Sequence, residues 1–222
     1  MSIKTSLAKP YNFQYNPQET ALLLIDFQRD FLLPDGFGAS LGNNTEYLQK
    51  AVKPTQRVLQ ECRSYGLLII HTREGHKPDL SDCPESKRQR GNLKKKIGDV
   101  GPMGRILIRG EYGHGIIDDL APLPKELVID KSGKGAFYAT VLDEQLKERN
   151  IKYLVIVGVT TEVCVESTVR EANDRAYEVL VLDNCVASYN QDFHEDTLRK
   201  ISSQNGIFGW IGNSEDFLKS LR

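Results

Sequence analysis

The sequence predicts an α/β fold, a three-layer α/β/α sandwich built around a mostly parallel sheet of about six strands. Short apolar runs without apolar–polar alternation carry this prediction, and they lie at residues 21–27, 67–72, 126–130, 153–159 and 178–182. Such runs are typical of strands that are buried on both faces. Helical patterns separate them, and alternation of strands and helices indicates a parallel sheet covered by helices.

The remaining elements follow in chain order. Residues 1–19 form an arm that contains Tyr11, Phe13 and Tyr15 ahead of the first strand. Apolar residues spaced three or four apart predict helices between these strands, at residues 47–65, 140–149 and 162–176. Weaker strand patterns occur at residues 105–108 and 206–210.

Composition and charge exclude several classes of protein. The 222 residues fit one domain over residues 1–222, and 29 Lys and Arg against 30 Asp and Glu give a net charge of −1. This balance argues against nucleic acid as a partner, because phosphate binding needs clustered cations. The sequence has no apolar run of the roughly 18 residues that cross a bilayer, and its first residues lack the apolar core of a signal peptide. We therefore expect a cytoplasmic protein without membrane contact.

One long irregular segment interrupts the strand–helix pattern at about residues 74–113, which are rich in Gly, Pro and charge. Segments of this length in compact domains are usually functional. The sequence leaves open whether this one is a lid or an oligomer contact.

Three reactive side chains stand where predicted strands end, at Asp26, Lys131 and Cys164. Ligands of parallel sheets bind at the carboxyl ends of the strands. A thiol at the start of a helix is stabilised as thiolate by the helix dipole and by a nearby ammonium, which together predict a lowered pKa for Cys164. A carboxylate beside the thiol can take its proton and pass it to a leaving amine. Each residue alone has a structural explanation, but together they predict an amidase that works without histidine.

The segments that contain these residues resemble the signature segments of the isochorismatase-like cysteine hydrolase superfamily. They are LLLIDFQRDF, IDKSGKGAF and VIVGVTTEVCVESTVREA, and the resemblance extends over about residues 11–217. It implies a catalytic triad of Asp26, Lys131 and Cys164. It also implies a cis peptide between Val159 and Thr160, with an oxyanion hole formed by the N–H groups of Thr160 and Cys164.

Three further segments resemble biuret hydrolases and their relatives that cleave ureido compounds, at residues 37–43, 71–76 and 204–209. In this group a Gln of the last loop holds a substrate carbonyl, and the matching residue is Gln204. Phe31, Phe37 and Val159 match residues that line the pocket. Without the resemblance, Gln204 would equally be a solvent-facing loop amide and the two phenylalanines plain core.

The resemblance also bears on metals, cofactors and partners. Nicotinamidases of the superfamily carry a metal site after the second strand, but here His71 and His76 come without the Asp-x-His pair of that site. We therefore expect no metal and no cofactor. A small-molecule substrate is the expected partner, and the relatives imply a homo-oligomer, a dimer or tetramer.

The favoured function is cleavage of biuret to allophanate and ammonia through a Cys164 thioester. Ureidoacrylate, N-carbamoylsarcosine and nicotinamide stay open as substrates, and the first and second of these need a cationic side chain such as Arg73, Arg105 or Arg109. A hydrolase that pairs a cysteine with His114 or His194 and a non-catalytic interaction protein are remoter alternatives. Packing accounts for Cys62 and Cys185, whereas Cys83 has no assignable role.

Overall fold

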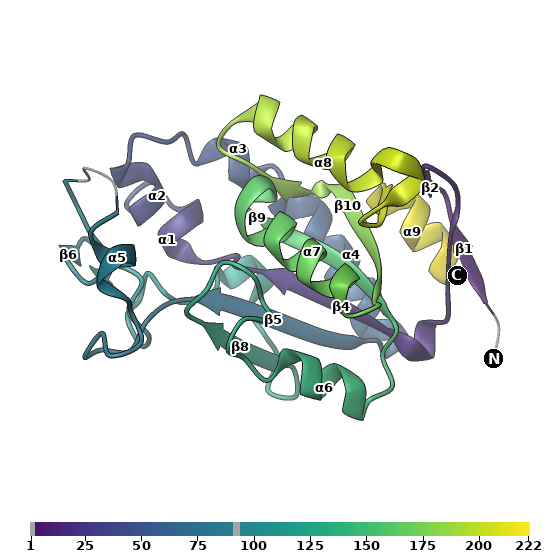
Figure 1. Cartoon of the computed structure of the whole chain (residues 1–222), viewed down its shortest axis with the longest axis horizontal. Coiled ribbons are helices and arrows are strands. Elements are labelled where there is room, and N and C mark those ends of the chain that lie inside the picture. The colour runs from purple at the N-terminus through teal and green to yellow at the C-terminus, as the bar shows by residue number, and fades with distance from the viewer. Residues whose placement is uncertain (1–2, 91–93) are drawn as a thin grey trace.

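The computed structural model describes residues 3–90 and 94–222, and a seven-stranded sheet runs through its centre (Figure 1). The strand order across the sheet is β2 (Ala8–Lys9), β11 (Trp210–Gly212), β10 (Glu178–Ala187), β9 (Tyr153–Val159), β4 (Thr20–Ile25), β5 (Leu68–Glu74) and β8 (Leu127–Lys131). Every pairing is parallel except that of β2 with β11. The predicted architecture is confirmed, and the sheet exceeds six strands because the N-terminal arm contributes β2.

Helices cover both faces of the sheet. One face packs against α4 (Val52–Tyr65) and α9 (Ser214–Leu221), and the other against α6 (Leu142–Glu148), α7 (Glu166–Asp174) and α8 (Gln191–Gly206). Along β4, Leu22 and Leu24 belong to the first core, while Leu23 and Ile25 belong to the second. All four side chains are buried, which explains why the sequence shows no alternation at this strand.

The helices differ from the prediction in number and in bounds. The predicted helix at 47–65 is split into α3 (Glu46–Gln49) and α4, which ends where Gly66 takes the left-handed conformation at φ 78°. The helices α8 and α9 were not predicted. Both begin at asparagine caps, since the side chains of Asn190 and Asn213 accept hydrogen bonds from the first turns.

The N-terminal arm packs on its own chain. It forms a hairpin of β1 (Lys4–Ser6) and β3 (Phe13–Tyr15), followed by the 3₁₀ turn η1 (Pro17–Glu19). Phe13 and Tyr15 are buried, and the Tyr15 hydroxyl lies 2.7 Å from the Ser220 hydroxyl on α9. The aromatic side chains at these two positions thus pack within one chain.

The long segment between β5 and β8 extends past the carboxyl edge of the sheet, on the left of Figure 1. It contains α5 (Glu85–Arg88), β6 (Val100–Gly101), β7 (Gly104–Arg105) and the 3₁₀ turn η2 (Asp118–Leu120), so that only Arg105 of the predicted strand 105–108 lies in a strand. Asp30, in α1 (Arg29–Leu32), anchors the segment by accepting a hydrogen bond from the Leu107 N–H. Over residues 3–90 and 94–222, no helix is long and apolar enough to cross a membrane.

Candidate active site

The strand order reverses between β4 and β9, and three predicted site residues meet at this point. From β4 the chain proceeds to β5 and β8 on one side, and from β9 to β10 and β11 on the other. In open parallel sheets the ligand crevice lies at the carboxyl ends of the strands beside such a reversal. Asp26 directly follows β4, Lys131 ends β8, and Cys164 lies in the π-helical turn η3 (Thr161–Val165) after β9.

Asp26 and Lys131 form a buried ion pair. The Lys131 Nζ lies 2.7 Å from the Asp26 Oδ2, and both side chains are 0% exposed. The same ammonium donates to the carbonyl oxygens of Gly133, at 3.1 Å, and Lys134, at 2.8 Å. The Thr72 hydroxyl donates to the Asp26 Oδ1 at 2.7 Å. These contacts fix the orientation of the carboxylate.

The backbone at Asp26 is unusual. Asp26 has a φ of 53°, in the left-handed region that non-glycine residues seldom occupy. Its N–H donates to the Thr72 carbonyl and its carbonyl accepts from the Gln28 N–H at 2.7 Å. Sparsely populated backbone conformations concentrate at functional sites, where the surrounding structure maintains them.

Cys164 lies beside this pair on a tight turn. Its sulfur and one carboxylate oxygen each of Asp26 and Glu74 all lie within 4.8 Å of one another. The Thr160 carbonyl closes the turn by accepting from the N–H groups of Val163 and Val165, both at 3.2 Å. The peptide between Val159 and Thr160 is cis, as predicted. The oxyanion-hole role of the Thr160 and Cys164 N–H groups stays a prediction.

The expected lowering of the Cys164 pKa was wrong. The thiol is only 4% exposed, and this burial raises its pKa well above the usual range. The Lys131 ammonium opposes that effect but is outweighed by burial and by the carboxylates of Asp26 and Glu74. Near neutral pH the Cys164 side chain is therefore a thiol rather than a thiolate.

This raised pKa predicts how Cys164 is alkylated. Iodoacetamide reacts with the thiolate, so labelling of Cys164 should be slow at pH 7 and should still be accelerating above pH 9. Peptide mass spectrometry after timed labelling between pH 6 and about 10 measures this profile. A plateau below pH 8 would show instead that Cys164 is already ionised in the resting enzyme.

Sequence analysis missed Glu74, a fourth charged residue of the site. Glu74 is the last residue of β5, and in the β5–β8 register it lies directly opposite Lys131. Its Oε2 accepts a hydrogen bond from the Cys164 thiol at 3.5 Å. The available signal was position, since β5 ends at the same edge of the sheet as the strands before Asp26 and Lys131.

Three ammonium groups keep the Glu74 carboxylate ionised. The Nζ atoms of Lys87 and Lys134 lie 2.9 and 2.8 Å from its Oε1. Burial of the carboxyl, which is 1% exposed, would raise its pKa, but the ammonium groups of Lys134, Lys131 and Lys87 together lower it to about 2. Lys87 comes from α5 and also donates to the Ser132 carbonyl, so the long segment supplies a side chain to the site.

The structure does not bring Gln204 to this site. The helix α8 runs from the carboxyl end of β10 back to the amino end of β11, and Gln204 lies in its last turn at φ 49°. It is exposed at the edge of the sheet opposite the one that carries Cys164. Within one chain, Gln204 therefore cannot hold the carbonyl of a substrate at Cys164.

The other residues expected to line the pocket lie at the correct edge. Val159 is the buried last residue of β9, and Thr160 separates it from the turn η3 that contains Cys164. Phe31 is half-buried in α1, where the Tyr189 hydroxyl donates to its carbonyl at 2.7 Å. Phe37 begins α2 (Phe37–Ser40) and is also half-buried. Their contact with substrate stays a prediction.

The side chains of the histidines contact residues other than Cys164. The His71 Nε2 lies 3.0 Å from the Glu126 carboxylate, and the His76 Nδ1 lies 3.4 Å from Asp82. The His194 ring nitrogen lies 2.9 Å from the Thr161 hydroxyl, and the His114 Nε2 lies 3.6 Å from the Asp130 carboxylate. These contacts leave the pairing of a histidine with the catalytic cysteine without support.

Within the described ranges, the one group of acidic and sulfur side chains close enough to share a metal ion is Asp26, Glu74 and Cys164. The ammonium groups of Lys131, Lys87 and Lys134 already neutralise its two carboxylates. A cation would have to enter against these positive charges, so the donor set suits a metal poorly. That the protein needs no metal stays a prediction.

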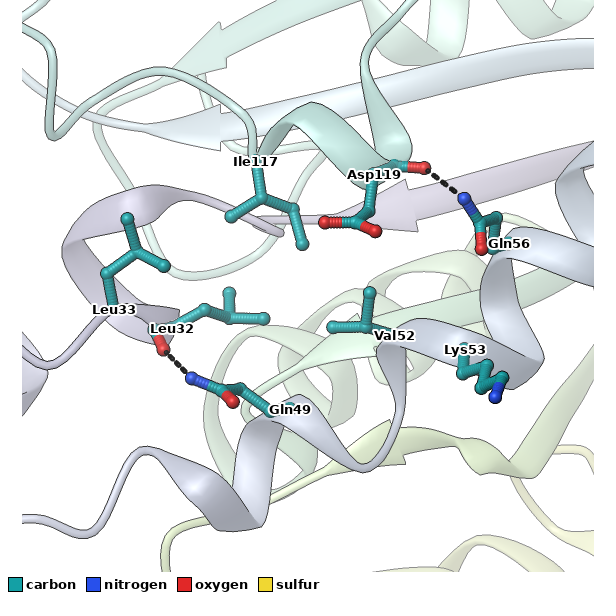
Figure 2. A pocket seen from close by; sticks show the side chains of 8 residues that line it. All are labelled: Leu32, Leu33, Gln49, Val52, Lys53, Gln56, Ile117 and Asp119. Atoms are coloured by element: carbon teal, nitrogen blue, oxygen red, sulfur yellow. Dashed lines mark hydrogen bonds between the residues drawn. The ribbon is translucent and has the colours of Figure 1, made fainter.

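A hollow of about 440 Å³ lies away from the chemistry, between α1, α4 and η2 (Figure 2). Its apolar lining includes Leu32, Val52 and Ile117, which belong to or pack on the core beneath α4. Cys164 belongs to the core on the opposite face of the sheet. The lining of this hollow includes none of Asp26, Glu74, Lys131 and Cys164.

Comparison with known proteins agrees with this geometry. The family model of the isochorismatase domain matches residues 20–216, which is most of the chain. The chain belongs to the isochorismatase family. It is an isochorismatase-family cysteine hydrolase.

Solved structures similar to this isochorismatase-family protein include a cysteine hydrolase from Pseudomonas syringae pv. phaseolicola 1448A. That structure is 25% identical, with a TM-score of 0.80 over 93% of this chain and 94% of the other. A pyrazinamidase/nicotinamidase from Streptococcus mutans UA159 is 27% identical, with a TM-score of 0.69 over 86% and 99%. An N-carbamoylsarcosine amidase from Thermoplasma acidophilum is 23% identical, with a TM-score of 0.67 over 89% and 97%, and shares the fold.

Proposed function

We propose that this protein is a cysteine amidohydrolase that cleaves the terminal C–N bond of a small urea-like substrate, with biuret as the favoured compound. The observation that carries the proposal is the assembly of the Asp26–Lys131 ion pair and the Cys164 thiol at the strand reversal. All three groups of the triad are present and lie close together. A non-catalytic interaction protein would not need this arrangement.

Acylation begins when Asp26 takes the proton of Cys164. The sulfur then attacks the terminal carbonyl carbon, and negative charge develops on the carbonyl oxygen, which the N–H groups of Thr160 and Cys164 stabilise. Lys131 favours the anionic forms of both Asp26 and the thiol, because its ammonium stays charged throughout. Asp26 returns the proton to the leaving nitrogen, ammonia departs, and a thioester with Cys164 is left.

Deacylation uses the same groups in reverse. Asp26, again ionised, takes a proton from water, and the hydroxide attacks the thioester carbon. Collapse of this second intermediate breaks the C–S bond, and the sulfur regains the proton from Asp26. Biuret and water give allophanate and ammonia, and Cys164 ends as the thiol with which it began.

The charges around the site favour a neutral substrate. A carboxylate-bearing substrate needs a free cation, yet Arg73 pairs with Asp130 at 2.7 Å and Arg109 with Asp82 at 3.1 Å. Arg105 donates to two backbone carbonyls. Lys87 and Lys134 both form ion pairs with Glu74. These pairings support biuret over ureidoacrylate and N-carbamoylsarcosine, whose carboxylates would have to compete for an occupied cation.

A substrate panel tests the proposal. Steady-state ammonia release should give a kcat/KM for biuret at least about tenfold above that for ureidoacrylate or N-carbamoylsarcosine, whose carboxylates would have to compete for a cation that is already paired. Nicotinamide, the remaining alternative substrate, is measured in the same panel. Triuret, another neutral ureido compound, should rank next to biuret. Preference for either carboxylate-bearing compound would overturn the argument from paired cations, and no ammonia from any of them would overturn the proposed activity.

A further inference from the structure

We propose that Glu74 determines specificity, accepting a hydrogen bond from the N–H group on the retained side of the scissile carbonyl and so selecting ureido compounds over plain carboxamides. The inference rests on the proposed function and assigns that site a residue outside the Asp26–Lys131–Cys164 triad. The Glu74 Oε2 contacts the sulfur itself, at 3.5 Å, so any acyl group bound to Cys164 lies next to this oxygen.

Glu74 is not the base of the reaction. Its carboxyl has a pKa of about 2, whereas the Cys164 thiol has a pKa well above its usual range. Three ammonium groups hold the Glu74 carboxyl ionised while burial makes the thiol hold its proton more tightly, so Glu74 is a poor acceptor for that proton. Over the working pH range, Glu74 acts only as a charged hydrogen-bond acceptor.

The fold holds this acceptor in place although its charge opposes formation of the thiolate. The Gln28 side chain binds the Glu74 backbone twice, donating to its carbonyl at 2.8 Å and accepting from its N–H at 2.7 Å. Lys87 and Lys134 occupy the Oε1. The Oε2 is thereby directed at the sulfur, where the substrate must bind.

The reaction removes the hydrogen-bond donor of this oxygen. In the resting enzyme the Cys164 thiol donates to the Oε2, but that proton moves to Asp26 when the sulfur attacks. A buried carboxylate oxygen that loses its donor is destabilised, more so next to a developing negative charge. An N–H group beside the scissile carbonyl replaces the lost donor. A methylene group at the same place cannot, which makes the contact selective for ureido substrates.

Biuret and malonamide provide the matched pair of substrates. They differ only in the central group, which is N–H in biuret and methylene in malonamide. We expect Glu74→Gln to lower the ratio of kcat/KM for biuret to that for malonamide by about tenfold, because a neutral acceptor replaces a charged one. Comparing the ratio between variants cancels the intrinsic reactivities of the two compounds.

The ratio separates this role from a structural one. A general loss of packing or a changed Cys164 pKa would alter both substrates alike and leave the ratio unchanged. Glu126→Gln is the matched control, since Glu126 is another nearly buried carboxylate, but it pairs with Arg63 and His71 at the amino end of β8. It should keep the wild-type ratio. An unchanged ratio in Glu74→Gln, or an equal drop in Glu126→Gln, would overturn the proposal.

Two further measurements keep the test decisive. If Glu74→Gln does not fold, Glu74→Asp retains the charge but withdraws the acceptor by one methylene, and its ratio should fall several-fold; an unchanged ratio overturns the proposal here too. Cys164→Ala tests the proposed function separately. If that variant still releases ammonia, the proposed function fails, whereas an inactive Cys164→Ala with an unchanged Glu74 ratio refutes the role of Glu74 alone.

Discussion

Replacing Cys164 with alanine should lower kcat for ammonia release by about 10⁴-fold or more, because removal of a covalent nucleophile leaves only binding and charge stabilisation. The protein should stay folded, since the change deletes one buried sulfur and leaves the Asp26–Lys131 pair intact. Steady-state assays with biuret together with circular dichroism measure both effects. Cys164→Ser should be nearly as inactive, because a hydroxyl gives up its proton far less readily than a thiol.

Cys185→Ala is the matched control for this loss. Cys185 is also fully buried and also has a pKa raised by burial, to about 12, but it lies in the core beneath α4. Its replacement should cost about 1 kcal/mol of stability and leave the rate within about twofold. Wild-type activity in Cys164→Ala, or equal losses in both variants, would contradict the nucleophilic role.

Replacing Lys131 with methionine should abolish activity and also destabilise the protein by about 3–5 kcal/mol. The change leaves the Asp26 carboxylate, which is 0% exposed, without its cation. A buried charge that loses its partner destabilises the folded protein strongly. For a domain of this size the loss corresponds to a fall of roughly 10 °C in the midpoint of thermal unfolding. Calorimetry or thermal circular dichroism measures the midpoint.

Two comparisons make that result specific. Lys152→Met removes a lysine whose pair with Glu19 is exposed, so the midpoint should stay nearly unchanged. The double variant Asp26→Leu with Lys131→Met removes both charges and should regain part of the lost stability while staying inactive. A double variant less stable than Lys131→Met alone would show that the pair is not the source of the loss.

The sheet could be predicted from the sequence because its strands are buried on both faces. Tyr153–Val159 forms the strand that its apolar run predicts, and the triad residues follow from their places at strand ends. The split of the helix at 47–65 and the added strand Ala8–Lys9 could not be predicted this way. Short backbone pairings such as that of β2 with β11 depend on where the sheet edge lies, which periodicity does not encode.

The site could be predicted less completely than the fold. The sign of the Cys164 pKa shift depends on burial, which competes with the lysines and is invisible in the sequence. The resemblance placed Gln204 in the pocket, but the direction of α8 puts it at the other edge of the sheet. Glu74 was missed because its partners Lys87 and Lys134 come from separate segments that only the folded chain brings together.

Trapping the covalent intermediate tests the central claim most directly. Rapid acid quench of the enzyme during turnover of biuret, followed by intact-protein and peptide mass spectrometry, should show the allophanyl group bound to the peptide that contains Cys164. The adduct should be absent from Cys164→Ala. Turnover at the wild-type rate with no adduct, or an adduct on Cys62, Cys83 or Cys185, would contradict the thioester mechanism.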